Sequence, residues 1–457
     1  MKSRLNKYDV AIVGGGISAL MAAYRLAYAA PSLNIVLIEK GLPLEKRGCP
    51  MITHKSGACV KCARCAIMEG MAGAGAFSDG KYVISTEYGG WLTDFLDRNV
   101  VIDYIEQADS ILVHFGATSE RYHPDDELKT LCLKHDLHMQ QAELKHLGTD
   151  ANYKTMKNMI DAVSERVEIL TKTEVIDVNK ETHMLYTPDG DIEADVILLA
   201  VGRAGSRWFA QWCRKNNVKM SNNQVDIGVR VELPALVWEH FSKRIYEPKI
   251  WYRSKRYGDV SRMFCFNERG SVVMENTEGV LTVNGHAYKD ENKKTQNSNF
   301  ALLSTTMFTE PFDNPIEYAR YVASLANLIS GGSVLVQRLG DLEAGRRTNE
   351  RRLKDATTKT TLSVVPGDLS LCMPKRQLDN IIETLHALDR VAPGTANHDT
   401  LLYGVECKYY SARPAAHDFE IEGCRGIFAA GDGAGFTRSL SHAAANGLYI
   451  ADKILKG

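Results

Sequence analysis

The sequence carries almost no net charge and has no long apolar run. Among 457 residues, 55 Lys and Arg nearly balance 56 Asp and Glu, giving a formal net charge of -1. This balance disfavours a globally basic nucleic-acid binder, although local basic patches stay compatible with it. No segment reaches the ~18 to 20 apolar residues that a membrane span needs. Internal repeats and low-complexity tracts are also absent. The shares of hydrophobic residues, 44%, and of charged residues, 24%, exclude collagen-like, coiled-coil and wholly disordered proteins.

The amino-terminal residues lack the features of a cleavable signal peptide. They are basic and an apolar stretch follows, but three glycines interrupt it and no small-residue cleavage site comes after. We therefore expect a cytoplasmic protein whose ten cysteines are reduced. Four of these cysteines lie between positions 49 and 65. That bias favours a metal or redox site over a disulfide framework.

Composition and length predict a globular protein with two parts. Hydrophobic residues make up 44% and charged residues 24%, which are ordinary values. The first and last parts of the chain share short, fully apolar strand patterns, whereas the central part is more mixed. We predict a discontinuous nucleotide-binding domain, residues 1–215 and 401–457, with a Cys- and Gly-rich loop at 45–82. Residues 216–400 are predicted to form an inserted α+β substrate domain.

The amino-terminal residues predict a β-α-β unit that binds a dinucleotide. Residues 8–13 and 34–38 are apolar enough to be buried parallel strands, and a helical stretch lies between them. Between the first strand and the helix, the sequence fits G-x-G-x-x-G/A, with its motif residues at Gly14, Gly16, Ile17, Ser18 and Ala19. The helix start would hold a pyrophosphate, and Glu39, at the end of the second strand, would accept from ribose hydroxyls.

Other segments predict helices and strands of both domains. We expect helices at 101–115, 149–166 and about 438–455, and a further buried strand at 195–200. Residues 225–233 alternate between apolar and polar side chains, which predicts a half-buried strand.

Two further glycine turns distinguish between dinucleotides. ADVILLAVG (194–202) ends at Gly202, and GIFAAGDGAG (426–435) contains Gly431, Asp432 and Gly433. With the amino-terminal motif, they resemble the three-part signature of glutathione-reductase-like FAD proteins. The resemblance implies a Rossmann-like α/β fold in which Asp432 holds a ribityl hydroxyl of the flavin. There is no second good G-x-G-x-x-G, so NAD(P)H is expected only as a transient donor, unless the substrate itself supplies the electrons.

Nearly the whole chain resembles a family of uncharacterised bacterial FAD-dependent dehydrogenases. The resemblance rests on blocks that occur in order: CPMITHKSGACVKCARCAIMEGMAGAGAFSDGKY (49–82), HLGTD (146–150), VDIGVRVE (225–232), VNGHA (283–287), SNFALL (298–303), LVQRLGDLEAGRRT (335–348), LLYGVECKYYSARP (401–414) and GDGAGFTRSLSHAAANG (431–447). Two residues depart from the family pattern. Ala72 and Ser439 stand where the family tends to have glycine.

The glycine-rich stretch after the cysteines supplies further candidate cofactor contacts. Gly73, Gly75, Ser78 and Asp79 are expected to form a flavin-facing loop whose amides and hydroxyl bind phosphate or carbonyl oxygens. His146 is a candidate catalytic residue in the block before a helix. Arg438 and His442, next to the Asp432 loop, are candidates for binding an anionic substrate or moving a proton. The alternative for each is a structural role.

The clustered cysteines leave three alternatives open. Cys59, Cys62 and Cys65 are spaced C-x2-C-x2-C, and Cys49 precedes a proline. This spacing is compatible with an iron–sulfur cluster, while structural zinc more often uses two separated pairs. Unligated thiols are the third alternative, and a pair of them would be a redox partner of the flavin.

The sequence leaves the substrate and the oligomeric state open. The leading hypothesis is hydride transfer between FAD and a small organic substrate. Two local basic clusters motivate an alternative, a flavoenzyme that oxidises or cleaves an amine or amino-acid substituent on a modified nucleic-acid base: Lys249, Arg253, Lys255 and Arg256; and Arg346, Arg347, Arg351, Arg352 and Lys354. A cysteine-based redox sensor or electron carrier is the third hypothesis.

Overall fold

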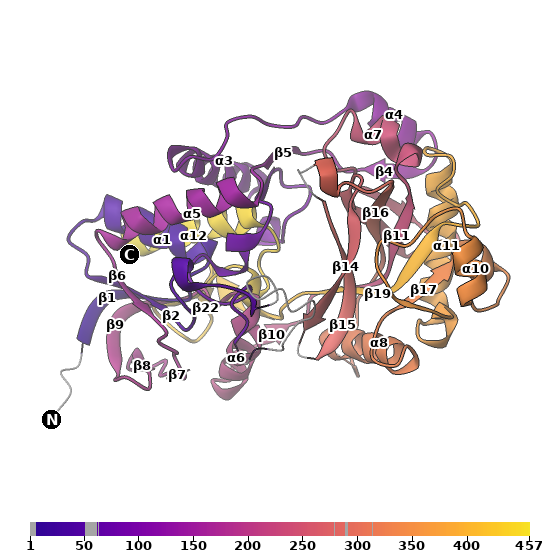
Figure 1. Cartoon of the computed structure of the whole chain (residues 1–457). Coiled ribbons are helices and arrows are strands. Elements are labelled where there is room, and N and C mark those ends of the chain that lie inside the picture. The colour runs from indigo at the N-terminus through magenta and orange to yellow at the C-terminus, as the bar shows by residue number, and fades with distance from the viewer. Residues whose placement is uncertain (1–5, 51–61, 63, 278, 288–290, 313) are drawn as a thin grey trace. The chain divides into compact units, whose positions relative to one another are not determined.

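The structure is a computed structural model that describes residues 6–50, 62, 64–277, 279–287, 291–312 and 314–457 (Figure 1). The chain has a mixed α/β fold and divides into two compact units. Unit 1 comprises Met1–Arg121, Ala142–Asn222 and Ser411–Gly457, and unit 2 comprises Tyr122–Gln141 and Asn223–Tyr410. Each unit has its own hydrophobic core. Among the described residues, no helix combines the length and apolar character needed to cross a bilayer.

Unit 1 is built on a parallel sheet. Its parallel strands follow the order β23-β9-β1-β2-β6, and short antiparallel strands extend it. The strands of this sheet are β1 (Asn6–Val13), β2 (Ile35–Glu39), β6 (Glu168–Thr171), β7 (Asp177–Val178), β8 (Met184–Tyr186), β9 (Ile192–Leu199), β21 (Ala416–His417), β22 (Glu420–Ile421) and β23 (Ile427–Ala429). Every residue of β2 is buried, as its apolar sequence predicts for a strand covered on both faces.

Helices α1, α5 and α12 pack together in unit 1 (Figure 1). An added Cβ at Gly447 of α12 would lie 2.1 Å from the carbonyl oxygen of Ser18 in α1, so glycine permits this close approach. The helices of the unit are α1 (Ile17–Ala29), α3 (Arg98–His114), α5 (Thr149–Ser164), α6 (Gly202–Lys215) and α12 (Leu440–Lys456). The remaining strands are β3 (Lys81–Ile84), which pairs with β5 (Glu143–His146), and β10 (Met220–Ser221), which pairs with β20 (Arg413–Pro414).

Unit 2 is built on a mixed sheet in the order β18-β17-β19-β11-β16-β13-β12-β4. The strands are β4 (Leu137–Met139), β11 (Val225–Pro234), β12 (Ile250–Arg253), β13 (Val260–Asn267), β16 (Asn297–Thr306), β17 (Leu335–Arg338), β18 (Val365–Pro366) and β19 (Leu401–Tyr409). A separate hairpin consists of β14 (Ser271–Thr277) and β15 (Val280–His286). The helices are α4 (Asp126–Leu133), α7 (Glu239–Ser242), α8 (Pro315–Ile329), α9 (Leu339–Glu343), α10 (Glu350–Asp355) and α11 (Lys375–Asp389).

The two units differ from the predicted domains at three places. Residues 122–141 belong to unit 2, because β4 pairs with β12 and Leu128 of α4 enters its core. Residues 401–410 also belong to unit 2, since β19 pairs with both β11 and β17. Residues 216–222 belong to unit 1, where β10 pairs with β20.

Strand β11 forms as predicted, but it is not half-buried. Residues 225–233 are all buried, including the charged positions. Arg230 Nη1 lies 3.5 Å from Glu406 Oε2, and both side chains are fully buried. The Asp226 carboxylate accepts from the hydroxyls of Thr305 and Tyr410. The alternation therefore marks two buried faces, one apolar and one of paired polar groups, rather than a solvent face.

Candidate dinucleotide-binding site

The predicted glycine turns meet at one edge of the sheet in unit 1. Strands β1, β2, β9 and β23 are parallel, so their carboxyl ends lie at the same edge. From β1 the chain passes through α1 to β2 on one side, whereas the strand on the other side of β1 is β9, which comes much later in the sequence. The strand order therefore reverses direction at β1, and ligands bind at such points in open α/β sheets.

The loop after β1 has the geometry that its glycines predict. Gly14 has φ +105°, and an added Cβ would lie 2.2 Å from the carbonyl oxygen of Ala200. Gly16 is the N-cap of α1, and a Cβ added there would meet no atom of the described residues within 4 Å. No side chain in the described part of the chain caps α1, and its first turn has no acidic residue. The helix thus begins with free space and uncapped amides, an arrangement suited to an anion.

The first turn of α1 contains three predicted contact residues with different surroundings. Ile17 begins the helix and is buried. The Ser18 hydroxyl donates a 2.7 Å hydrogen bond to the carbonyl oxygen of Ala443, so it holds α12 rather than presenting a free donor. Ala19 is fully buried, as close packing between helix and sheet requires.

Glu39 lies at the end of β2 and is buried among loop amides. Its Oε2 accepts from the amide of Gly15 at 2.7 Å, and its Oε1 accepts from those of Gly41 and Gly70 at 2.7 and 3.1 Å. A carboxylate has about four lone-pair sites, so the described residues leave one of them to a ligand hydroxyl. Glu39 therefore also organises the loops, a role that its sequence position did not reveal.

The glycine-rich loop of residues 70–77 lies against the loop after β1. The amide of Ala72 donates to the carbonyl oxygen of Gly15 at 2.8 Å. A Cβ added at Gly73 would lie 3.1 Å from Cα of Gly16, so these two glycines are neighbours. A Cβ added at Gly75 would lie 2.6 Å from the side chain of Leu440 in α12.

Two buried residues that the sequence analysis missed hold this loop. Within the described part of the chain, the Arg47 guanidinium donates four hydrogen bonds, all to backbone carbonyl oxygens between Ala66 and Gly73. The Asn152 amide nitrogen donates to Gly75, and its oxygen accepts from the Tyr82 hydroxyl. Both residues are remote in sequence from the glycines, and no motif marked them.

Ser78 and Asp79 follow the glycine loop and make contacts within unit 1. The Ser78 hydroxyl donates to the carbonyl oxygen of Gly75 at 2.8 Å. Asp79 Oδ2 lies 3.4 Å from His146 Nε2 and 3.5 Å from Lys81 Nζ. Burial alone would raise the pKa of Asp79, but the hydrogen bond to His146 and the charge on Lys81 outweigh it and lower the pKa to about 2. Asp79 is thus an anion that can orient the His146 ring.

The loops after β9 and β23 touch one another. Gly202 has φ +60°. A Cβ added at Gly433 would lie 2.4 Å from the carbonyl oxygen of Gly202. Gly431 has φ +75° and lies close to the Ser18 hydroxyl. Glycine suits Gly202 and Gly431 because their φ angles are positive, and it suits Gly433 because the backbone of Gly202 lies so close.

Asp432 lies in the loop after β23 with one oxygen engaged. Its Oδ1 accepts from the Thr437 hydroxyl at 2.7 Å, and its Oδ2 lies 3.8 Å from Arg203 Nε. Burial raises the pKa of Asp432, while Arg203 and the Thr437 hydrogen bond act in the opposite direction. Oδ2 is therefore the oxygen best able to accept from a ligand hydroxyl.

His442 is packed in the first turn of α12. Its Nε2 lies 2.9 Å from the carbonyl oxygen of Ser85, which only accepts, so Nε2 carries a proton. Burial lowers the pKa of His442 to about 4, so the ring is neutral at pH 7. These contacts favour a structural role over proton transfer.

Ser439 and Arg438 lie next to His442. Ser439 caps α12, because its hydroxyl accepts from the His442 amide, which gives a physical reason for serine where the family tends to have glycine. The Arg438 guanidinium lies 5.2 Å from the centre of the Trp91 ring.

The predicted metal ligands are only partly within the described residues. Cys59 lies outside them, Cys62 and Cys65 are exposed, and Cys49 is half-buried. Among the described residues, no group of three or more His, Cys, Asp or Glu is arranged to hold a metal ion. An iron–sulfur cluster or zinc at these cysteines therefore stays a prediction.

The basic clusters of unit 2 are partly paired with acids. Lys255 and Arg256 lie 3.2 Å from Asp136 and Asp379. In the second cluster, Arg346 and Arg352 both lie near the buried Asp341. These pairings reduce the local excess of positive charge that a phosphate backbone would require.

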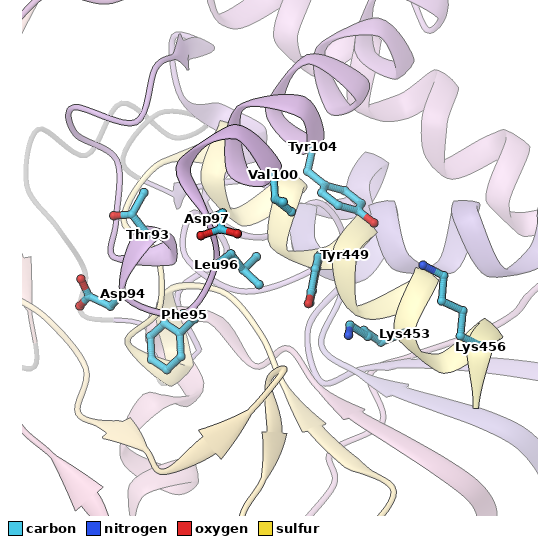
Figure 2. A pocket seen from close by; sticks show the side chains of 10 residues that line it. All are labelled: Thr93, Asp94, Phe95, Leu96, Asp97, Val100, Tyr104, Tyr449, Lys453 and Lys456. Atoms are coloured by element: carbon cyan, nitrogen blue, oxygen red, sulfur yellow. The ribbon is translucent and has the colours of Figure 1, made fainter.

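An open cavity of about 630 Å³ lies elsewhere in unit 1, between α3 and the end of α12. Figure 2 shows Tyr104, Tyr449 and Lys453 on its wall. None of the residues predicted from the sequence to contact a cofactor or substrate lines it.

Comparison with known proteins agrees with the sequence motifs. Residues 225–409 match the family described as "FAD-dependent protein, C-terminal domain-like", which confirms the resemblance to FAD-dependent proteins. An uncharacterized protein from Clostridium beijerinckii is 26% identical over 469 residues, covering 97% of this chain and 80% of the relative. Glycine oxidase from Geobacillus kaustophilus is similar in structure, with 13% identity, coverage of 99% and 95%, and a TM-score of 0.39. L-proline dehydrogenase from P. horikoshii has 12% identity, coverage of 99% and 94%, and a TM-score of 0.41.

Proposed function

We propose that this protein is an FAD-dependent oxidoreductase that transfers a hydride between the flavin and a small organic substrate. The observation that carries the proposal is the meeting of the loops after β1, β2, β9 and β23 at one sheet edge, beside the uncapped start of α1. The match of residues 225–409 to a family of FAD-dependent proteins supports the choice of dinucleotide.

The residues at this edge fit the parts of FAD. The space beside Gly16 and the first amides of α1 suit the pyrophosphate. Glu39 and Asp432 each have a carboxylate oxygen able to accept from a sugar or ribityl hydroxyl. FAD supplies the redox chemistry when bound, while the protein binds and orients it. By analogy, the fold is of the glutathione-reductase type.

The cofactor assignment is tested by the absorption spectrum of protein purified without oxygen. We expect flavin bands, and release of one FAD per chain on denaturation. Bleaching of the bands by NAD(P)H alone would identify a nicotinamide as the donor. A broad brown absorbance besides the flavin bands would place an iron–sulfur cluster at the cysteines. Absence of flavin, even after incubation with FAD, would contradict the proposal.

Substitution of Gly16 tests the location of the site. Its φ of -75° is open to any residue, and a Cβ there meets no described atom within 4 Å, so Gly16→Leu is expected to fold. The added side chain would fill the space proposed for the pyrophosphate. We expect FAD affinity to fall at least about tenfold, or about 1.4 kcal/mol, in a titration of the apoprotein. Ala29→Leu, at the exposed end of the same helix, is the control and should bind FAD normally.

A further inference from the structure

Arg47 holds a loop that lies next to the start of α1. Its side chain is buried, and its hydrogen bonds to described residues all go to uncharged backbone groups. The guanidinium donates from Nε to Ala66 at 2.9 Å, from Nη2 to Ile67 at 2.8 Å, and from Nη1 to Met71 and Gly73 at 2.5 and 2.8 Å. A planar fork of donors is needed to reach four carbonyl oxygens of one loop.

The same loop is held from the other side by Glu39. The carboxylate accepts from the amide of Gly70, while the guanidinium donates to carbonyl oxygens before and after that residue. Burial lowers the pKa of Arg47 to about 10, and the charge on Glu39 partly opposes this effect. Arg47 is therefore a cation at neutral pH, and residues 66–73 lie between a fixed positive and a fixed negative charge.

The loop carries this arrangement to the proposed pyrophosphate site. Gly73 accepts from Arg47 through its carbonyl oxygen and is a neighbour of Gly16. Ala72 donates to Gly15, which fixes the same part of the loop against the turn after β1. Only one residue, Gly73, thus separates the guanidinium from the glycine that opens α1.

We propose that Arg47 is a positioning residue for the cofactor, which sets the loop 66–73 against Gly16 and contributes positive charge behind the pyrophosphate. This inference rests on the proposed function, since it assumes that FAD binds at this edge. A dinucleotide would bring negative charge close to a buried cation that, among the described residues, donates no hydrogen bond to a carboxylate. Charge and hydrogen-bonding geometry therefore both contribute to FAD affinity.

Two substitutions separate the charge from the geometry. Arg47→Lys keeps the charge but loses the fork of donors, and Arg47→Gln loses the charge. We expect FAD affinity, measured by titration of the apoprotein, to fall in the order wild type, Arg47→Lys, Arg47→Gln, with a loss of at least about tenfold for Gln. Added salt should weaken FAD binding more steeply in the wild type than in Arg47→Gln.

Arg121→Lys is the matched control. Arg121 belongs to the same unit, but its guanidinium donates to the carboxylates of Glu106, Asp109 and Glu143 instead of to the loop. This variant should keep wild-type FAD affinity and salt dependence. In Arg47→Lys, hydrogen exchange should become faster at the amides of residues 66–73 and stay unchanged in β1 and β9.

The outcomes distinguish this inference from the proposed function. If the wild type binds no FAD, the proposed function fails. If the wild type binds FAD, and both folded variants bind it with the affinity and salt dependence of the wild type, the positioning role is overturned. If Arg47→Gln does not fold, Arg47→Lys alone decides, since unchanged affinity and unchanged exchange in the loop would overturn the inference.

Discussion

At the scale of single residues, Ala72 has a backbone conformation that side chains with branched Cβ atoms do not tolerate. Its φ is +66° and its side chain is buried. Glycine would relieve about 1–2 kcal/mol of strain. However, it would lose a buried methyl worth about 0.8 kcal/mol and would gain freedom in the unfolded chain worth about 0.4–1 kcal/mol.

These opposing terms predict that Ala72→Gly changes the free energy of unfolding by less than about 1 kcal/mol. Ala72→Val should lower it by at least about 2 kcal/mol, because strain and overpacking act together. Chemical denaturation of both variants tests this. A stable Ala72→Val protein would show that the loop adopts another conformation in solution.

Glu232 predicts a pH dependence of stability in unit 2. It is fully buried and accepts from the hydroxyls of Thr361 and Tyr403 at 2.6 and 2.5 Å. Burial raises its pKa, an effect that those hydrogen bonds only partly offset. The folded state therefore keeps a proton that the unfolded chain has already lost above about pH 4.3. Stability from this group is present at low pH and falls as pH rises through the folded-state pKa.

Glu232→Gln removes this titration. The free energy of unfolding, measured between pH 4.5 and pH 8, should fall less with rising pH in the variant than in the wild type. Each pKa unit by which the folded-state value of Glu232 exceeds its unfolded-state value corresponds to about 1.4 kcal/mol of unfolding free energy lost over this pH range. Parallel pH profiles for the two proteins would show that Glu232 has an ordinary pKa in the folded state.

At the scale of elements, local patterns were predicted well and remote partners were not. The β1-α1-β2 unit is contiguous, so its apolar runs and glycines sufficed to predict two strands, a helix and the turn. The alternation in 225–233 predicted a strand. It did not reveal that the polar face of this strand is also buried, where charged side chains such as Arg230 have buried partners. Burial of a charge depends on its partner, and Glu406 lies far from Arg230 in sequence.

The candidate site shows the same division. Gly14, Gly16 and Glu39 could be proposed from the sequence because the motif that singles them out is made of neighbouring residues. Arg47 and Asn152 act through hydrogen bonds to backbone atoms of a loop about 20 or more residues away in sequence. Every residue has a backbone carbonyl group, so the sequence does not indicate which ones accept these bonds. The assignment of residues 122–141 to unit 2 was missed because β4 is short and pairs with a distant strand.

At the scale of the whole molecule, the separate cores predict that FAD stabilises the two units unequally. All residues proposed to contact FAD belong to unit 1, whose core is separate from that of unit 2. A ligand that binds only the folded state stabilises it by about 2.7 kcal/mol at one hundred times its Kd. At an FAD concentration one hundred times the Kd, we expect the free energy of opening measured by hydrogen exchange to rise by about 2.7 kcal/mol in β1 and β9. In β11 and β16 it should stay nearly unchanged.

Gly16→Leu supplies the control for this measurement, because FAD should then protect neither unit at the same concentration. Equal protection of both units in the wild type would mean that they unfold as one cooperative body, so that stabilisation of one is shared by the other. Protection of β11 and β16 alone would place the cofactor in unit 2 and contradict the proposed site. Unequal protection, confined to the parallel sheet, is the outcome that the separate cores require.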